Sequence, residues 1–173
     1  MALSATERTK LDDLLLIQFQ LVDLPFVHVV FSYSPIGENN EPPANLLTDF
    51  LEFRNPSLQL AFPRIKNDRM DAILVHADTA FQKGAFNVDE PMSDESVSPA
   101  VIDLVLVPML ICDKEGYRVE YGKGYYDKYL EHCNPGSLKA GICYFEPIDE
   151  ISDKSGFDVP LDLCITPYNV YVF

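Results

Sequence analysis

Basic side chains are scarce in this chain. Its 173 residues include 13 lysines and arginines against 27 aspartates and glutamates, a formal net charge of −14. Such an excess of negative charge disfavours general binding to nucleic acids or anionic membranes, and an anionic ligand would need a local basic pocket. Long apolar runs are also missing, because none reaches the ~18 residues of a membrane span. We therefore expect a protein that binds neither nucleic acid nor membrane.

Several common signatures of functional sites are absent as well. The four cysteines show no C-x-x-C spacing, and the three histidines lack the spacing of metal ligands. We interpret the cysteines as reduced, mostly buried thiols of a cytosolic protein. Neither the Gly-x-Ser-x-Gly of serine hydrolases nor the Gly-x-x-x-x-Gly-Lys-Ser/Thr of phosphate-binding loops occurs. The acidic residues Glu7, Asp12 and Asp13 do not fit a secretory signal, so we expect a cytoplasmic location.

The length and an apolar fraction of 47% are typical of one folded domain with a sizeable core. Predicted strands alternate with predicted helices, which indicates an α/β fold: a single domain with a largely parallel sheet and helices on both faces. A capping box of Ser4 and Glu7 starts the first helix, and Pro25 ends it. Further expected elements are helices at 44–53 and 125–132, strands at 27–33, 58–62, 70–76, 101–112, 140–145 and 163–166, an edge strand at 169–173, and an irregular surface segment at 78–100.

The turn between the apolar run 101–112 and the third expected helix carries the most promising chemistry. Gly122 and Gly124 flank Lys123 there. Glycine lets the main chain approach a ligand closely, and successive free N–H groups form a nest for an anion. Arg118 can add a fork of donors that matches phosphate oxygens. This arrangement indicates a nucleotide-phosphate site beyond the carboxyl end of a strand, with an ordinary loop as the alternative.

The same region resembles the 5-formyltetrahydrofolate cyclo-ligase family, whose members are also called methenyltetrahydrofolate synthetases. The similarity begins with Ile-Asp-Leu-Val-Leu-Val-Pro at 102–108 and continues through Asp113, Gly116 and Arg118. It is most specific at 121–130, which reads Tyr-Gly-Lys-Gly-Tyr-Tyr-Asp-Lys-Tyr-Leu. Weaker matches follow the family order at Glu41, 62–64, 87–91, 157–162 and 164–166.

The resemblance implies an ATP- and magnesium-dependent ligase of folate metabolism. The family converts 5-formyltetrahydrofolate to 5,10-methenyltetrahydrofolate, and ATP becomes ADP and phosphate. We accordingly expect a monomeric enzyme of one-carbon metabolism whose partners are small-molecule substrates.

The resemblance also implies roles for individual residues. Two basic residues would act in catalysis, namely Lys123 and Arg118. The nucleotide would be held by Arg118, Gly122, Lys123, Gly124 and Tyr126. The folate would contact Glu41, Tyr121 and Tyr125, and magnesium would bind Asp127 and Asp158, whose carboxylate oxygens are the hard ligands that this ion prefers.

Two departures from the family pattern bear on activity. Family members usually begin with a lysine- and arginine-bearing helix segment, and the single domain expected at 1–173 lacks a counterpart. Glu120 stands where the family has glycine, and its charge would repel nucleotide phosphates unless Arg118 or another cation pairs with it. A non-catalytic relative that binds folate or nucleotide is therefore a second hypothesis, whereas Lys123, Asp127 and Asp158 favour an active ligase.

Overall fold

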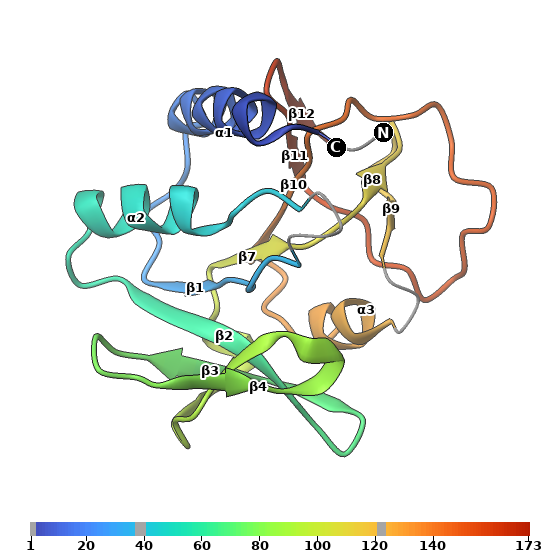
Figure 1. The fold of residues 1–173 in the computed structure, drawn as a ribbon. Coiled ribbons are helices and arrows are strands. Elements are labelled where there is room, and N and C mark those ends of the chain that lie inside the picture. Colours follow the sequence, from blue (N-terminus) through green and yellow to red (C-terminus); the bar gives the residue numbers. More distant parts are fainter. Residues whose placement is uncertain (1–2, 37–40, 121–123) are drawn as a thin grey trace.

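An eight-stranded sheet forms the centre of the protein in a computed structural model that describes residues 3–36, 41–120 and 124–173 (Figure 1). In sheet order the strands are β12 (Val170–Val172), β11 (Leu163–Ile165), β10 (Leu138–Ile142), β7 (Leu104–Val107), β1 (Val29–Phe31), β2 (Gln59–Lys66), β3 (Arg69–Val75) and β6 (Ser96–Val97). The run from β11 to β2 is parallel throughout, and antiparallel strands continue the sheet at both edges.

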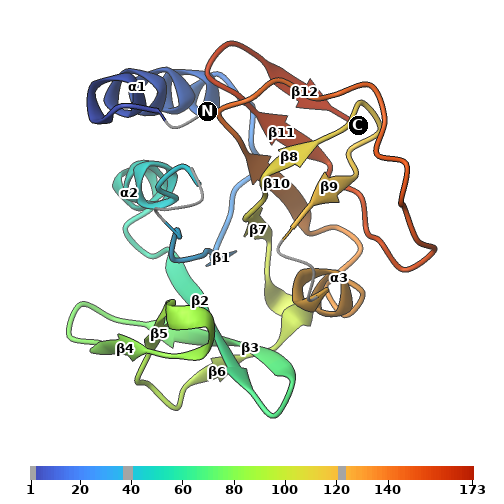
Figure 2. The same ribbon diagram turned by 45° about the vertical axis from the view of Figure 1, so that its right-hand side comes forward.

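Helices cover both faces of this sheet. Helix α1 (Ala5–Gln20) and helix α2 (Asn45–Arg54) pack on one face, and the short helix α3 (Tyr125–Leu130) packs on the other (Figures 1 and 2). The prediction of a largely parallel α/β sheet with helices on both faces is confirmed.

Strand β7 contributes side chains to the hydrophobic cores on both faces of the sheet. Its four residues are fully buried, and successive side chains of a strand point to opposite faces. Leu104 and Leu106 join the core beneath α1 and α2, whereas Val105 and Val107 join the core beneath α3. The continuous apolar run in the sequence is therefore the mark of a strand covered on both sides.

The predicted capping box at the first helix is confirmed. The Ser4 N–H donates to Glu7 Oε2 at 2.8 Å, and the Glu7 N–H donates to Ser4 Oγ at 3.3 Å. Helix α1 ends at Gln20, before Pro25, and buries Leu15 and Phe19 against the sheet.

The apolar run 101–112 is not one strand, contrary to the prediction. Its middle forms β7, and its last two residues form β8 (Ile111–Cys112), which pairs with β9 (Arg118–Val119) in a separate two-stranded sheet. Pro108 comes directly after β7 and has no N–H to continue the ladder. The chain therefore leaves the main sheet at Pro108 and turns across its carboxyl edge.

The segment 78–100 is more regular than predicted. It contains β4 (Phe81–Lys83) paired with β5 (Asp89–Pro91), a 3₁₀ turn η2 (Ala85–Asn87), strand β6 and a second 3₁₀ turn η3 (Pro99–Val101). All residues of β4 are exposed, so the strand has no alternation of apolar and polar residues for a sequence pattern to detect.

Strands β2 and β3 form a hairpin that extends further than the predicted strand at 58–62. The backbone groups of Gln59 and Ala61 bond to the β1 segment, and alternate residues of a strand point the same way, so the nitrogen of Pro63 also faces the β1 side. The pairing with β1 ends at Ala61, before Pro63 is reached. The missing N–H of this proline therefore breaks no ladder bond there. Asn67 and Asp68 form the turn with φ angles of 51° and 57°, a left-handed conformation that these two residue types tolerate.

The cysteines are free thiols, as expected, and Cys112, Cys143 and Cys164 are buried. Burial raises the pKa of Cys143 to about 12, so this thiol stays protonated at neutral pH. None of the helices in the described ranges is long and apolar enough to span a bilayer.

Candidate functional site

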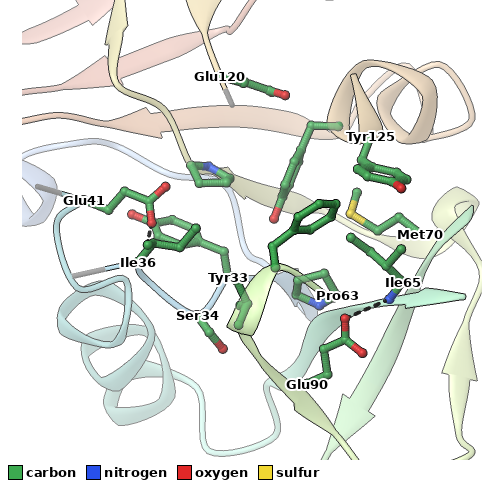
Figure 3. A pocket seen from close by; sticks show the side chains of 14 residues that line it. Tyr33, Ser34, Ile36, Glu41, Pro63, Ile65, Met70, Glu90, Glu120 and Tyr125 are labelled. Atoms are coloured by element: carbon green, nitrogen blue, oxygen red, sulfur yellow. Dashed lines mark hydrogen bonds between the residues drawn. The ribbon is translucent and has the colours of Figure 1, made fainter. Parts of the chain in front are cut away.

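A pocket of about 360 Å³ opens beyond the carboxyl ends of the parallel strands β1 and β7 (Figure 3). Loops after both strands, the β2–β3 hairpin, the η2–β5 segment, the end of β9 and the start of α3 form its walls. Its volume suits a small organic ligand, and its position is where open α/β sheets bind ligands. The described residues that line it are Tyr33, Ser34, Ile36, Glu41, Pro63, Ile65, Met70, Phe86, Val88, Glu90, Pro108, Glu120, Tyr125 and Tyr126.

Two aromatic rings form one wall of the pocket. The ring centroids of Phe86 and Tyr125 lie 6.1 Å apart, and the ring planes meet at 54°. Phe86 has a φ of 58°, a strained conformation for a bulky residue, and such strain is concentrated at functional sites. The Tyr125 hydroxyl donates to Asp68 Oδ1 at 3.4 Å, which ties α3 to the tip of the β2–β3 hairpin. A flat heteroaromatic ring could pack against this wall.

Two buried carboxylates in the pocket are held by backbone donors. The N–H of Ile36 donates to Glu41 Oε2 at 2.5 Å, and the N–H of Ile65 donates to Glu90 Oε1 at 3.2 Å (Figure 3). Close packing fixes Glu90 further, because a Cβ atom on Gly84 would lie 2.1 Å from the Glu90 Cδ. Fixed carboxylates of this kind can accept hydrogen bonds from the N–H groups of a ligand.

Arg118 connects three segments beside the pocket. Its side chain is only 2% exposed. Nε donates to Glu120 Oε1 at 2.6 Å, Nη2 to Asp127 Oδ1 at 2.9 Å, and Nη1 to the Val159 carbonyl oxygen at 2.5 Å. The pairing that would offset the charge of Glu120 is therefore present. The predicted contact of Arg118 with phosphates stays a prediction, since all three guanidinium nitrogens bond to protein oxygens here.

The environment of Glu120 is nonetheless unfavourable for a charge. Burial raises the pKa of this carboxyl above its usual value, while the charge of Arg118 and its hydrogen bond act in the opposite direction. The charges of Asp127 and Asp158 raise the pKa further, so three carboxylates share the neighbourhood of one guanidinium.

Tyr126 brings a buried hydroxyl to the pocket. Its ring stacks on Phe31 with centroids 6.1 Å apart, and its oxygen has no hydrogen-bond partner among the described residues. Burial first, and then the charges of Glu120 and Glu41, raise the pKa of Tyr126 well above its usual value. The phenol therefore stays protonated and can donate to a ligand, which would also remove the cost of an unsatisfied buried hydroxyl.

The predicted phosphate turn is covered only in part. Tyr121, Gly122 and Lys123 lie outside the described residues, and their roles stay predictions. Gly124 precedes α3 directly and has a φ of 60°, in the left-handed region that glycine adopts without strain. Phosphates at this turn would consequently lie next to Tyr125 and the pocket.

The two predicted magnesium ligands lie in one neighbourhood, since the charges of both act on Glu120. Asp127 Oδ1 accepts from Arg118 and from the Val159 N–H at 3.0 Å, and the Asp158 carboxylate accepts from the Ser155 N–H and hydroxyl. Within the described ranges, no group of three or more His, Cys, Asp or Glu residues could hold a metal ion. Magnesium often binds one or two carboxylates together with substrate phosphates, so this pair fits an ion that arrives with a nucleotide.

Sequence reasoning missed much of the pocket wall. Tyr33 was assigned only to a strand, and Ile65 and Met70 lay beyond or at the edge of short predicted strands. Phe86 and Glu90 lie in the expected irregular surface segment 78–100, and only Glu90 falls within the stretch 87–91 that resembles the family. The resemblance is the one sequence signal that points to Glu90, and no sequence signal points to Phe86.

The open, mostly parallel sheet and the ligand-sized pocket at its carboxyl edge define an α/β protein that binds small molecules. The model of the 5-formyltetrahydrofolate cyclo-ligase family matches residues 19–167, and the chain belongs to this family of enzymes. The resemblance found in the sequence is thereby confirmed.

Individual relatives agree with this assignment. The 5-formyltetrahydrofolate cyclo-ligase of Mycoplasma pneumoniae is 30% identical over 169 residues, covering 95% of this chain and 90% of the relative. The structure of a 5,10-methenyltetrahydrofolate synthetase from Aquifex aeolicus is similar with a TM-score of 0.81 and 28% identity, covering 98% of this chain and 84% of that one. A synthetase structure from Mycoplasma pneumoniae has a TM-score of 0.72 and 27% identity, covering 96% and 90% of the two chains.

Proposed function

We propose that this chain catalyses the ATP- and magnesium-dependent cyclisation of 5-formyltetrahydrofolate to 5,10-methenyltetrahydrofolate, with ADP and phosphate as further products. Membership of the family so named gives the reaction class. The observation that carries the proposal is that Glu41, Tyr125 and Tyr126, from distant parts of the sequence, line one pocket. Glu41 and Tyr125 are two of the three residues to which the family resemblance gives contact with folate, and the third, Tyr121, lies outside the described residues.

The reaction requires little covalent chemistry from the protein. A formamide carbonyl is a poor electrophile, so its oxygen must first become a good leaving group. Transfer of the γ-phosphoryl group of ATP to that oxygen achieves this, and the neighbouring amine then attacks the carbon and expels phosphate. The protein has to align the formyl oxygen with the γ-phosphate and to neutralise the developing charge, which needs no side-chain nucleophile.

The pocket suits the pterin end of the folate. Phe86 and Tyr125 offer ring surfaces for stacking, and Glu41 and Glu90 are held as acceptors for ring N–H groups. Tyr126 has a protonated hydroxyl to donate to a ligand oxygen. Together these groups could fix the orientation of the pterin while its formyl group faces the phosphate turn.

The phosphate half of the site is assigned to the turn 122–124 and to the neighbouring carboxylates. Lys123 would neutralise charge on the transferring phosphoryl group, and Asp127 and Asp158 would hold the magnesium ion that accompanies ATP. Magnesium, when bound, supplies further neutralisation of the phosphates. Arg118 fixes Asp127 and Glu120 in place.

The decisive experiment follows the absorbance of the methenyl product. Purified protein is mixed with 5-formyltetrahydrofolate and Mg-ATP, and parallel reactions omit ATP or magnesium. We expect product only in the complete mixture. Saturable binding of folate without any methenyl formation would contradict the proposal and support a non-catalytic relative. The pairing of Glu120 with Arg118 already weakens one of the two arguments for that alternative.

A further inference from the structure

The side chain of Glu120 takes part in an ion pair and also lines the pocket. It is 14% exposed, it accepts from Arg118 Nε at 2.6 Å, and it lines the pocket. The family pattern has glycine at this position, so the pocket carries a carboxylate that the pattern does not specify. The pairing with Arg118 fixes where this carboxylate lies.

Arg118 offsets only part of the negative charge around Glu120. One guanidinium is shared between Glu120 and Asp127, so the three side chains together carry an excess negative charge. Among the described residues that line the pocket, Glu41, Glu90 and Glu120 are acidic and none is basic. The three carboxylates lie at different sides of the pocket (Figure 3). The described walls thus favour a ligand with positive charge.

The proposed reaction creates such a ligand. Once the formyl oxygen carries the phosphoryl group, the lone pair of the second nitrogen forms a bond to the formyl carbon. The C–O bond breaks, phosphate leaves with the electron pair, and the second nitrogen loses its proton. The remaining N–C–N unit is an amidinium with one positive charge, whereas the formamide of the substrate is neutral.

We propose that Glu120 is a specificity-determining residue that stabilises the cationic amidinium relative to the neutral formamide. The inference rests on the proposed function and names the charge that this pocket prefers. Opposite charges at several ångströms beside a protein surface interact strongly enough to change an affinity ratio about tenfold. A carboxylate already held in place by Arg118 needs no reorganisation when the charge appears.

The test compares two ligands that differ at the reacting nitrogens. Calorimetric titrations at neutral pH, without ATP or metal, measure the Kd of 5-formyltetrahydrofolate and of freshly prepared 5,10-methenyltetrahydrofolate. Both ligands share the pterin and glutamate portions, so the ratio of the two Kd values isolates the effect of the ring cation. The same titrations at higher salt provide a second measurement that needs no variant.

Three variants separate charge from shape. Glu120→Gln keeps the shape and an oxygen that can accept from Arg118, whereas Glu120→Asp keeps the charge. Glu52→Gln is the matched control, because Glu52 is exposed on α2 and does not line the pocket. We expect Glu120→Gln to lower the preference for the methenyl ligand about tenfold, and the other two variants to retain most of it.

The results distinguish failure of the role proposed for Glu120 from failure of the proposed function. An unchanged ratio of Kd values in a folded Glu120→Gln variant overturns the role of Glu120, and the proposed function stands if turnover persists. If Glu120→Gln does not fold, the unaltered protein decides: added salt must weaken methenyl binding more than formyl binding, and equal weakening overturns the inference. Failure of the unaltered protein to bind either folate overturns the proposed function and the inference together.

Discussion

Removal of the buried guanidinium of Arg118 is the sharpest test of the network beside the pocket. Arg118→Met retains a long side chain and leaves Glu120, Asp127 and the Val159 carbonyl without their shared donor. Removal of one partner from a buried ion pair costs about 3–5 kcal/mol, because the remaining charges stay desolvated. With the donor side chain 2% exposed and three bonds lost, we expect a loss in that range at neutral pH.

The loss of unfolding free energy in Arg118→Met should depend on pH. Burial raises the folded-state pKa of Glu120, so the folded chain binds more protons than the unfolded chain between the two pKa values. Stability therefore falls as pH rises through this window. Arg118 lowers the pKa of Glu120, so its removal raises the folded-state pKa further and extends the pH range over which stability falls. We expect Arg118→Met to lose less stability at about pH 5 than at about pH 7, because Glu120 takes up a proton.

Urea denaturation of the variant and the unaltered protein at both pH values measures these effects. Arg69→Met is the matched control, because it removes an exposed arginine from β3 and should change the unfolding free energy by no more than about 0.5 kcal/mol. A loss below about 1 kcal/mol for Arg118→Met, as for a surface ion pair, would refute the reasoning. Equal losses at both pH values would show that Glu120 is not the group that titrates.

Three further substitutions test other parts of the site. Lys123→Ala should lower ATP-dependent turnover by at least ~100-fold with an unchanged melting temperature, and unchanged turnover would exclude its role. Asp127→Asn should alter the magnesium dependence of the reaction, and an unaltered dependence would contradict the metal assignment. Gly84→Ala should displace Glu90, raise the KM for folate and cost about 1–3 kcal/mol in denaturation, whereas Gly156→Ala, with open space around its Cβ, should have little effect.

The sequence was informative where one local pattern decided the structure. Ser4 and Glu7 specified the start of α1 because their mutual hydrogen bonds involve only one turn of chain. The unbroken apolar residues of β7 indicated a strand covered on both faces, and Pro108 ended it earlier than the apolar run suggested. The family resemblance supplied what composition could not, namely the reaction class.

The pocket itself could not be predicted from local patterns. The three residues of β4 are all exposed and the strand is held by its pairing with β5, so its own residues carry little signal. Burial of Glu90 depends on Gly84 and on the N–H of Ile65, which lie in other segments. The sequence singles out Glu120 as a departure from the family pattern, but the orientation of its side chain depends on Arg118 and on burial that only the folded chain provides.

The pocket described above consists of segments that lie far apart along the chain, from Tyr33 after β1 to Tyr126 in α3. A ligand that needs all of these segments in their folded arrangement binds the folded chain in preference to the unfolded chain. A ligand that fills the pocket would contact the hairpin, the sheet edge and α3 at the same time and would hold these three segments together. At a ligand concentration of 100 times its Kd, such a ligand adds about 2.7 kcal/mol to the stability of the fold. Such a ligand would thereby reduce the fraction of unfolded protein.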